Sequence, residues 1–205
     1  MEYLIREYSH TRDRDELIQI WLAALPDDFL SQLGAEFIVE TYIPELLASS
    51  DSHGYVAMES NEIKGFVFAC NSVGLLKRVV TQNLYKFIKA WVLAFRNAPF
   101  LLMALTISVA VYVIRSAISP NAVDEVMELC YIAIHPNCQS MGVGKALVER
   151  LDNELRTRTN AKGLVVKTLQ GKGVGRSGSF YEVNGFKIKR ICGTRVIYIK
   201  EIEKQ

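Results

Sequence analysis

The chain has 205 residues, half of them hydrophobic, and a formal net charge of +2. These values are typical of an enzyme-sized domain that buries one core. Outside residues 63–123 the acidic residues outnumber the basic ones, which argues against a nucleic-acid-binding protein.

The cysteines and histidines indicate neither a disulfide framework nor a metal site. No two of the four cysteines have CxxC spacing, which favours reduced thiols of a cytosolic protein. The three histidines are scattered along the chain and form no metal-ligand pattern. The first ten residues contain no apolar stretch of signal-peptide length. We therefore expect a cytoplasmic protein that binds no metal.

The first seventy residues predict three strands and two helices. The strands are expected at 3–8, 54–59 and 63–70. The helices, with apolar residues at three- and four-residue spacing, are expected at 12–25 and 29–48. Pro44 should kink or end the second helix. Ser60 and Asn61 should form the turn between the last two strands.

The turn between the two predicted helices, Pro26-Asp27-Asp28, carries two carboxylates. They could attract a cationic amine. The alternative is a helix N-cap with a solvated neighbour, and this alternative is favoured.

A long segment follows the third predicted strand and is both apolar and basic. Apolar residues recur at helical spacing over 75–95, and residues 98–114 are almost continuously apolar. Between Ile63 and Val123 there are seven basic residues and no acidic residue, so the rest of the chain has a net charge of −5. The sequence predicts a helical pair, 75–95 and 99–116, whose apolar surface something must cover.

A membrane span is a poor explanation of this segment. The run 98–114 would be about 26 Å long as a helix, short of the roughly 30 Å hydrocarbon core of a bilayer. A single crossing would also separate strands that are expected to share one sheet. Three alternatives remain for residues 75–116: a lid over a binding groove, an interface in a homodimer, or a peripheral contact with a membrane surface.

Residues 126–155 combine a strand, a glycine-bearing loop and a helix. The strand, 126–135, is mostly apolar and contains Glu128, and the loop supplies Gly142 and Gly144. Backbone N–H groups at the start of the following helix, 145–155, would converge with the positive end of the helix dipole, which favours a phosphate. Residues required by a P-loop and by a dinucleotide fingerprint are missing, so neither site is expected.

The C-terminal quarter predicts further strands at 163–169, 186–191 and 195–202. The first of them should pair beside the strand that carries Glu128. Residues 171–178 are rich in glycine and are predicted to form a loop. A Phe180-Tyr181 pair follows this loop and precedes Gly185.

Two of these motifs resemble those of the GNAT superfamily of N-acetyltransferases. The pattern Gln-x-x-Gly-x-Gly-x-x-Leu, from Gln139 to Leu147, is similar to the acyl-coenzyme A pyrophosphate loop of that family, and the Phe-Tyr pair ahead of Gly185 is similar to its late helix and turn. The resemblance implies an α/β (α+β) fold in which a mixed, splayed central sheet is flanked by helices. It also implies one domain, 1–205, in which the helical pair at about 72–122 is inserted between the third and fourth strands.

The resemblance implies an acetyl-CoA-dependent N-acetyltransferase that transfers the acetyl group directly to an amine of a small molecule or a protein. A family glutamate at the position of Glu128 often takes the proton of the amine, and a structural salt bridge is the alternative. Tyr181 matches the family tyrosine near the sulfur of the leaving thiolate, and a core tyrosine is the alternative. No cysteine is placed with a histidine as a nucleophile–base pair, so no covalent enzyme intermediate is expected.

The resemblance also assigns residues to the co-substrate. Backbone N–H groups at Ile132 and Ile134 could hold the oxygen of the tetrahedral intermediate. The expected acetyl-CoA-binding residues are Ile132, Ala133, Ile134, Gln139, Ser140, Met141, Gly142, Val143, Gly144, Lys145 and Ser177. The sequence departs from the family where Val174 and Ser177 replace an asparagine and an alanine, which weakens the contact expected there with the pantetheine arm.

The same motifs are compatible with a protein of a second class. It would be a non-catalytic acyl-CoA-binding module that associates with a membrane surface or a partner through its helical insertion. The expected partners of the enzyme are acetyl-CoA and an amine acceptor, whereas the module would bind acyl-CoA without turnover.

Overall fold

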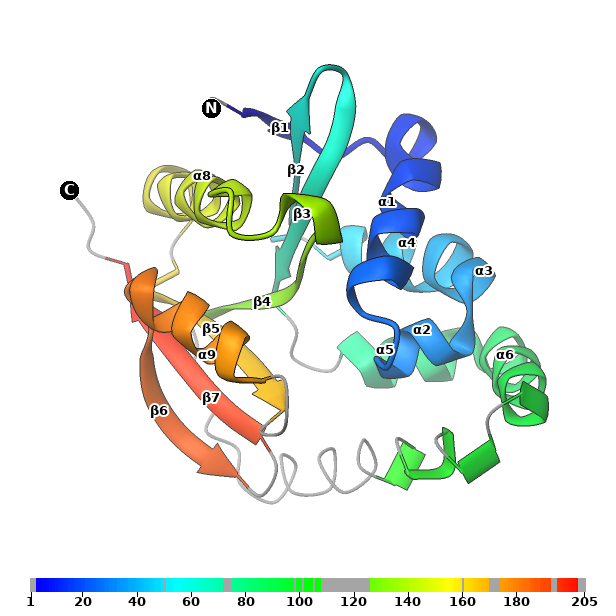
Figure 1. The fold of residues 1–205 in the computed structure, drawn as a ribbon. Helices are drawn as coiled ribbons and strands as arrows, with labels where there is room; N and C mark the ends of the chain where they lie inside the picture. The colour runs from blue at the N-terminus through cyan, green and yellow to red at the C-terminus, as the bar shows by residue number, and fades with distance from the viewer. Residues whose placement is uncertain are drawn as a thin grey trace.

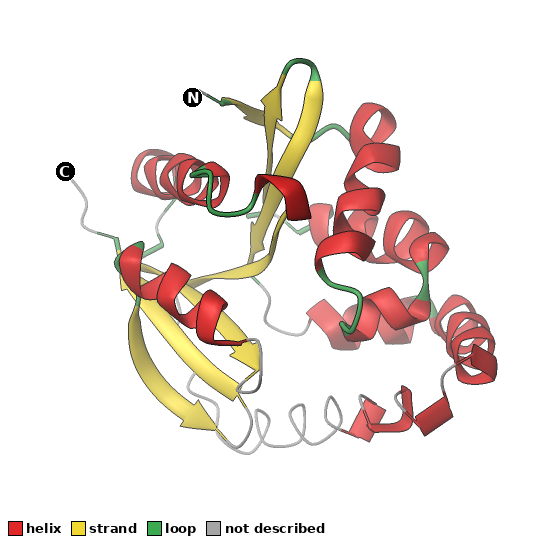
Figure 2. Ribbon diagram, viewed as in Figure 1, coloured by secondary structure: helices red, strands yellow, loops and turns green. Residues whose placement is uncertain are grey.

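The computed structural model shows a mixed sheet with helices on both faces (Figures 1 and 2). Its seven strands lie in the order β1-β2-β3-β4-β5-β7-β6. The predicted mixed sheet flanked by helices is confirmed. The structure describes residues 3–49, 51–71, 75–97, 99–100, 102–104, 106–107, 126–159, 161–169, 174–192 and 195–202.

Four antiparallel strands form the first half of the sheet. They are β1 (Leu4–Glu7), β2 (His53–Glu59), β3 (Glu62–Cys70) and β4 (Val126–Ile134). The turn between β2 and β3 has positive φ angles at Ser60 (52°) and Asn61 (67°), as a two-residue hairpin turn requires. Each of these strands lies within about a residue of the position predicted from hydrophobic alternation.

The second half of the sheet begins with a parallel pair of strands. β5 (Gly163–Leu169) pairs parallel to β4, and then antiparallel to β7 (Arg195–Glu201). β6 (Lys187–Cys192) pairs with β7 at the edge. The prediction that residues 163–169 lie beside the Glu128 strand is confirmed.

Helices of the N-terminal part cover one face of the sheet. They are α1 (His10–Ala24), α2 (Phe29–Leu33), α3 (Ala35–Phe37), the π-helix η1 (Ile38–Tyr42) and α4 (Ile43–Leu47). The prediction of one helix over 29–48 was wrong, because Gly34 adopts φ 96° and interrupts it. Pro44, which has no N–H, lies at the start of α4 directly after the π-helix η1, in a helical run that continues from Ala35 to Leu47.

Two more helices, α5 (Leu75–Gln82) and α6 (Leu84–Asn97), lie between β3 and β4 in the chain and pack on this helical layer. A single helix over 75–95 was predicted, but the chain turns at Asn83, whose side-chain amide donates to Glu45 Oε1 (2.9 Å). Residues 99–107 are helical where described, and the rest of the predicted helix 99–116 lies outside the described residues. Among the described residues, no helix is both long enough and apolar enough to span a membrane.

The opposite face of the sheet carries α8 (Val143–Arg158) and α9 (Val174–Val183). Because successive side chains of a strand point to opposite faces, the hydrophobic core is divided between the two faces of the sheet. Phe66 and Phe68 face the N-terminal helices, and Val67 and Ala69 pack with α8. The functional site expected from the sequence lies where β4, α8 and α9 come together.

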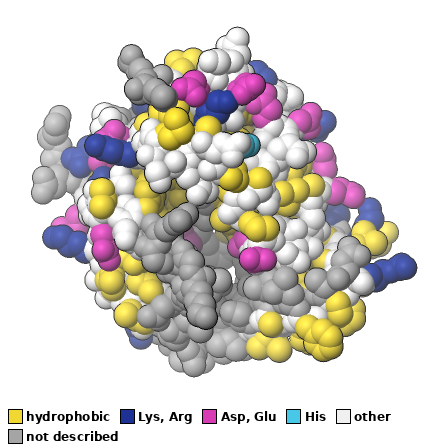
Figure 3. Space-filling model, in the orientation of Figure 1, with side chains coloured by type: hydrophobic (Ala, Val, Ile, Leu, Met, Phe, Trp, Pro, Cys, Tyr) yellow, Lys and Arg dark blue, Asp and Glu magenta, His cyan; other side chains and the backbone are white. Residues whose placement is uncertain are grey.

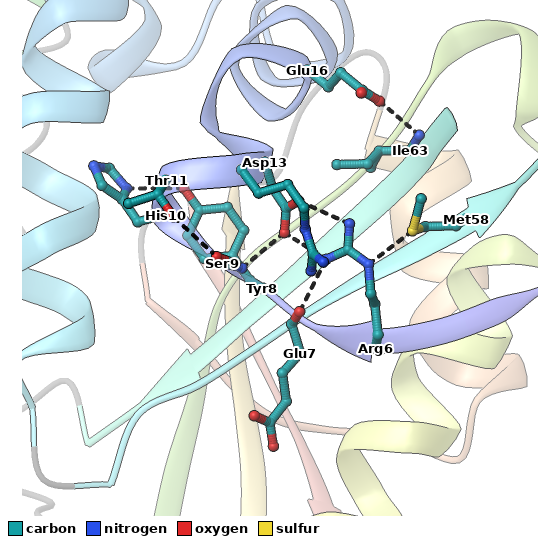
Figure 4. A network of polar contacts seen from close by, with 11 residues as sticks. Arg6, Glu7, Tyr8, Ser9, His10, Thr11, Asp13, Glu16, Met58 and Ile63 are labelled. Atoms are coloured by element: carbon teal, nitrogen blue, oxygen red, sulfur yellow. Dashed lines mark hydrogen bonds and ion pairs between the residues drawn. The ribbon is translucent and has the colours of Figure 1, made fainter. Parts of the chain in front are cut away.

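A polar network joins β1 to the start of α1 (Figure 4). The Arg6 guanidinium donates from Nη1 and Nη2 to the two carboxylate oxygens of Asp13 (2.6 and 2.8 Å). The Ser9 N–H and Arg12 Nε donate to the same carboxylate (2.8 and 3.0 Å). Asp13 is 1% exposed, and although burial opposes ionisation, these hydrogen bonds lower its pKa.

Candidate functional site

The sheet splits between β4 and β5. The two strands pair only from Val126–Gly163 to Leu129–Val166, whereas β4 continues beside β3 as far as Ile134. The register of β3 with β4 shifts between Phe68 and Ala69, so Cys130 is an extra residue, a bulge, in β4. The bulge lies where β4 leaves β5, and the following residues of β4 have an edge that β5 does not cover.

The backbone of β4 presents alternate residues to this open edge. The His135 N–H donates to Lys64 O (2.8 Å), so His135 points its hydrogen-bonding groups toward β3. In an antiparallel pair, residues alternate between those that bond the partner strand and those that face away. Ile132 and Ile134 therefore turn their N–H and C=O groups toward the split, and Ala133 turns its own toward β3. Two of the three predicted strand residues are thus available to a ligand through their backbone.

The loop that follows β4 ends at the N-terminus of α8. Gly142 is the N-cap residue with φ 88°, and a Cβ built on it would meet no atom within 4 Å. The first helical bond of α8 runs from the Ala146 N–H to Gly142 O (3.0 Å). The N–H groups of Val143, Gly144 and Lys145 precede it and have no partner within the helix. Unpartnered N–H groups at a helix start are the groups predicted to bind the pyrophosphate, and we call them the candidate anion site.

The other predicted loop residues surround this helix start. Ser140 has φ 65°, and Gln139 follows a 3₁₀ turn, η2 (Pro136–Cys138). Met141 and Lys145 are exposed, and Lys145 Nζ lies 3.7 Å from Glu149 Oε1. The Lys145 ammonium thus lies beside Glu149, one turn further along α8.

Gly144 has a different role from Gly142. A Cβ on Gly144 would lie 2.9 Å from Cε2 of Phe180, so its absence allows α9 to approach the start of α8. The next residue in α9 is Tyr181, and it therefore lies near the end of the sheet where α8 begins. The second glycine of the motif therefore serves packing between α8 and α9.

Tyr181 is buried in the core on the α8 face of the sheet. Its ring contacts those of Phe180, Phe186 and Tyr198, with centroids 5.3 to 5.6 Å apart. Burial raises the pKa of its hydroxyl, which stays protonated at neutral pH. Within the described part of the chain this hydroxyl has no hydrogen-bond partner. A neutral, unpartnered phenol is a proton donor for a ligand that reaches it.

The glycine-rich stretch before Tyr181 differs from the prediction. Residues 171–178 were expected to be a loop, but α9 begins at Val174. Ser177 lies in the first turns of α9, and its side chain lies outside what the structure describes. Helical geometry overrides the low propensity of Gly175 and Gly178, because Phe180 and Tyr181 of the same helix are anchored in the core.

Glu128 forms an ion pair with Lys167 of β5. Their side chains are 20% and 26% exposed. The structural salt bridge considered as an alternative for Glu128 is therefore present. Lys167 was not among the predicted site residues, although it is the one charged residue of the strand 163–169 and follows two positions after Val165, which pairs with Glu128.

Asp28 joins the α1–α2 turn to β4. It accepts the Leu30 N–H (3.0 Å) as an N-cap, the alternative favoured from the sequence, and it also accepts the Tyr131 hydroxyl (3.2 Å). The Tyr131 ring lies 4.3 Å from that of Trp21 and 5.8 Å from that of Tyr42. This aromatic cluster stands on the face of β4 that carries Glu128. Tyr131 was not among the predicted site residues, because the rings that it contacts belong to α1 and η1.

Comparison with known proteins relates this chain to a family. Residues 105–188 match the family model described as the acetyltransferase (GNAT) domain. The chain carries a GNAT acetyltransferase domain. A search of the curated proteins by sequence finds no significant match.

The GNAT domain also resembles solved structures of low sequence identity. The PaiA N-acetyltransferase of Thermoplasma acidophilum, in complex with coenzyme A, aligns with a TM-score of 0.60 and 14% identity over 98% of this chain and 99% of the other. The ribosomal-protein-S18-alanine N-acetyltransferase of Escherichia coli gives 0.57 and 13% over 100% and 96%. An aminoglycoside 6'-N-acetyltransferase complexed with coenzyme A gives 0.60 and 13% over 98% of each chain. At these identities, the resemblance shows a shared fold.

Several of the predicted site residues lie near the split in the sheet. The candidate anion site, the open edge of β4 and the Phe180–Tyr181 pair lie on connected elements, since Phe180 packs on Gly144. Glu128, Lys167 and Tyr131 lie on the opposite face, toward α1. The described residues contain no group of three or more His, Cys, Asp or Glu side chains placed to hold a metal ion.

Proposed function

We propose that this GNAT domain binds acetyl-CoA in the split between β4 and β5 and transfers its acetyl group to an amine. The observation that carries the proposal is the open edge of β4, where Ile132 and Ile134 present backbone groups just ahead of the helix start at Gly142. Such an edge suits the amides of a pantetheine arm, and the helix start suits its pyrophosphate. Two of the structures with this fold are complexes with coenzyme A, which supports the assignment.

The reaction needs two proton transfers. The amine nitrogen attacks the thioester carbon, the C–N bond forms, and the C–S bond breaks with its electron pair leaving on sulfur. Glu128 accepts the proton lost by the amine, directly or through a water. The N–H groups of Ile132 or Ile134 donate to the oxygen of the tetrahedral intermediate. Tyr181, kept neutral by burial, supplies a hydrogen bond or a proton to the leaving thiolate.

The acceptor enters from the face of β4 that carries Glu128 and Tyr131. Asp28 and Glu128 place two carboxylates on that side. The Tyr131 hydroxyl donates to Asp28, and the Tyr131 ring packs against those of Trp21 and Tyr42. This environment suits an ammonium group on an apolar or aromatic carrier. The acceptor class is an amine of a small molecule or of a protein.

Turnover separates this enzyme from a non-catalytic acyl-CoA-binding module. The full chain is incubated with acetyl-CoA and a panel of amines, including amino sugars, polyamines and peptide N-termini, and free thiol is followed with a chromogenic disulfide. We expect thiol release that depends on one class of amine, and calorimetric binding of acetyl-CoA. Binding without release for every amine in the panel supports the module instead.

We treat residues 1–205 as one domain in which α5 and α6 are inserted between β3 and β4. We also propose that the segment 75–116 contacts either a second subunit or a membrane surface, because apolar side chains of its described part, from Leu84 to Ile107, are exposed.

A further inference from the structure

Helix α6 has one face against the protein and one face in solvent. On the inner face, Ala90 and Ala94 are buried, and Phe87, Trp91 and Phe95 pack against the core under the N-terminal helices. Phe87 lies 6.0 Å from Phe37 and 6.5 Å from Phe29, ring centre to ring centre. The outer face of α6 is defined by side chains that are half or more exposed: Leu84, Tyr85, Ile88, Val92 and Leu93.

The chain that follows α6 extends this apolar surface. Phe100 is 90% exposed, and Met103 and Ile107 are also exposed, at helical spacing. Leu102, between them, is fully buried, and Trp91 Nε1 donates to Thr106 Oγ1 (3.1 Å), so the segment is held beside α6. Figure 3 shows hydrophobic side chains gathered at the lower right, over these elements. Eight of the thirteen large hydrophobic side chains exposed in the described residues lie between 84 and 107, which marks this surface as a contact site.

The apolar outer face is bordered by positive charge. At 100° per residue, Arg96 and Lys89 lie around α6 next to the stripe of Leu84, Ile88 and Val92, and Lys86 lies beyond Leu93. Lys86 and Arg96 form no ion pair within the described residues, and Lys89 pairs with Glu36 between two largely exposed side chains (3.2 Å). The region 63–123 contains no acidic residue, and the rest of the chain carries −5. The segment that contains α6 is therefore basic in sequence, whereas the rest of the chain is acidic.

We propose that the outer face of α6, together with Phe100, Met103 and Ile107, docks on an anionic lipid bilayer. An amphipathic helix with aromatic and aliphatic side chains on one side and basic residues beside them is the form that binds in the plane of such a surface. The aliphatic and aromatic groups enter the headgroup region, and the ammonium and guanidinium groups meet lipid phosphates. The acidic remainder of the chain is repelled, which fixes the orientation.

The geometry favours a bilayer over a second copy of this chain. A symmetric dimer would set this surface against itself and bring basic residues together without acidic partners from the region 63–123. α6 has 14 residues, about 21 Å at 1.5 Å per residue, and its inner face is already packed on α2 and α3. It can therefore lie along a bilayer without leaving the domain. This inference does not depend on the acetyl-transfer proposal.

Vesicle binding tests the inference without acetyl-CoA. The full chain is sedimented with vesicles of phosphatidylcholine alone and of phosphatidylcholine with about one third phosphatidylglycerol. We expect binding to the anionic vesicles that weakens as salt rises from about 0.1 M to about 1 M, where the Debye length falls from about 10 Å to about 3 Å. Equal binding to neutral vesicles, or no binding to either, overturns the inference.

Matched variants assign the binding to this surface. Ile88→Glu, at a side chain 50% exposed, should abolish sedimentation, and Ile191→Glu on β6, at 54%, should leave it unchanged. Lys86→Gln and Arg96→Gln should each weaken binding about fivefold. All variants should keep the melting temperature and turnover of the parent, which separates failure of this inference from failure of the proposed function. Light scattering that finds a dimer which Ile88→Glu converts to a monomer overturns the inference in favour of a second copy.

Discussion

The Lys167 ammonium meets the Glu128 carboxylate where β5 leaves β4. Lys167 is the first residue of β5 after the last pair between the strands, Leu129–Val166, and its side chain reaches back to Glu128. The ion pair thus spans the opening of the split in which we place acetyl-CoA. It makes Glu128 both a structural partner and a candidate base, and these two roles predict different behaviour on mutation.

Glu128→Gln should lower kcat by about a hundredfold or more, the scale of a lost general base. The loss should shrink at high pH, where the acceptor amine is already deprotonated. If Glu128 only neutralises Lys167, adding Lys167→Met to Glu128→Gln removes both charges and restores activity. We expect the double variant to regain thermal stability but to stay inactive. Recovery of kcat in the double variant would assign the base to another group.

The candidate anion site at the start of α8 is tested by two variants of equal shape. Gly142 has φ 88°, which strains any L residue, but asparagine and aspartate tolerate this region best. Gly142→Asn and Gly142→Asp should therefore lose similar stability. Two like charges about 4 Å apart near a protein surface repel by about 4 kcal/mol, so the aspartate variant should bind acetyl-CoA at least about tenfold more weakly than the asparagine variant. Equal affinities in calorimetry would place the pyrophosphate elsewhere.

The strands of this fold were predictable because each alternates or is continuously apolar over its own length. Residues 163–169 are one such case, and the structure has the strand at the same residues. Breaks within helices were less predictable, since they depend on single residues. Gly34 interrupts a predicted helix with a left-handed φ, and Asn83 turns the chain between α5 and α6 while it bonds Glu45, 38 residues away.

The part of the candidate site whose residues are close together in the sequence was predictable. The loop from Gln139 to Lys145 carries its glycines within one turn, and its helix start is visible in the pattern. Contacts between residues far apart in the sequence could not be predicted. Lys167 reaches Glu128, and Tyr131 reaches Asp28, across 39 and 103 residues of sequence. These partners follow only from the register of β4 with β5 and from the docking of the α1–α2 turn on β4.

Tyr181→Phe should lower kcat about a hundredfold and leave acetyl-CoA affinity unchanged. Because the hydroxyl has no partner among the described residues, its removal should not lower the melting temperature. Burial raises the pKa of Tyr181, so the wild-type rate should show no loss through its deprotonation between about pH 6 and pH 9. Stopped-assay rates and calorimetry on both proteins check this. A normal rate in the variant would leave Tyr181 as a core aromatic residue alone.

Asp13 should control acid stability through its bonds to Arg6. Asp13→Asn keeps the shape of the side chain but leaves the Arg6 guanidinium, 21% exposed, without its counter-charge, and should cost about 3 kcal/mol of unfolding free energy at pH 7. The pKa of Asp13 is lowered in the folded state, so the stabilisation is present above the unfolded pKa of about 3.9 and is lost as pH falls through the lower, folded value. Urea titrations should show a constant gap between wild type and variant from about pH 5 to pH 8 and a closing gap below about pH 4. Asp15→Asn, at a side chain 92% exposed, is the control and should leave the urea midpoint unchanged. A gap that persists undiminished into acid would mean that the amide is tolerated poorly for its shape, and that the charge of Asp13 contributes nothing.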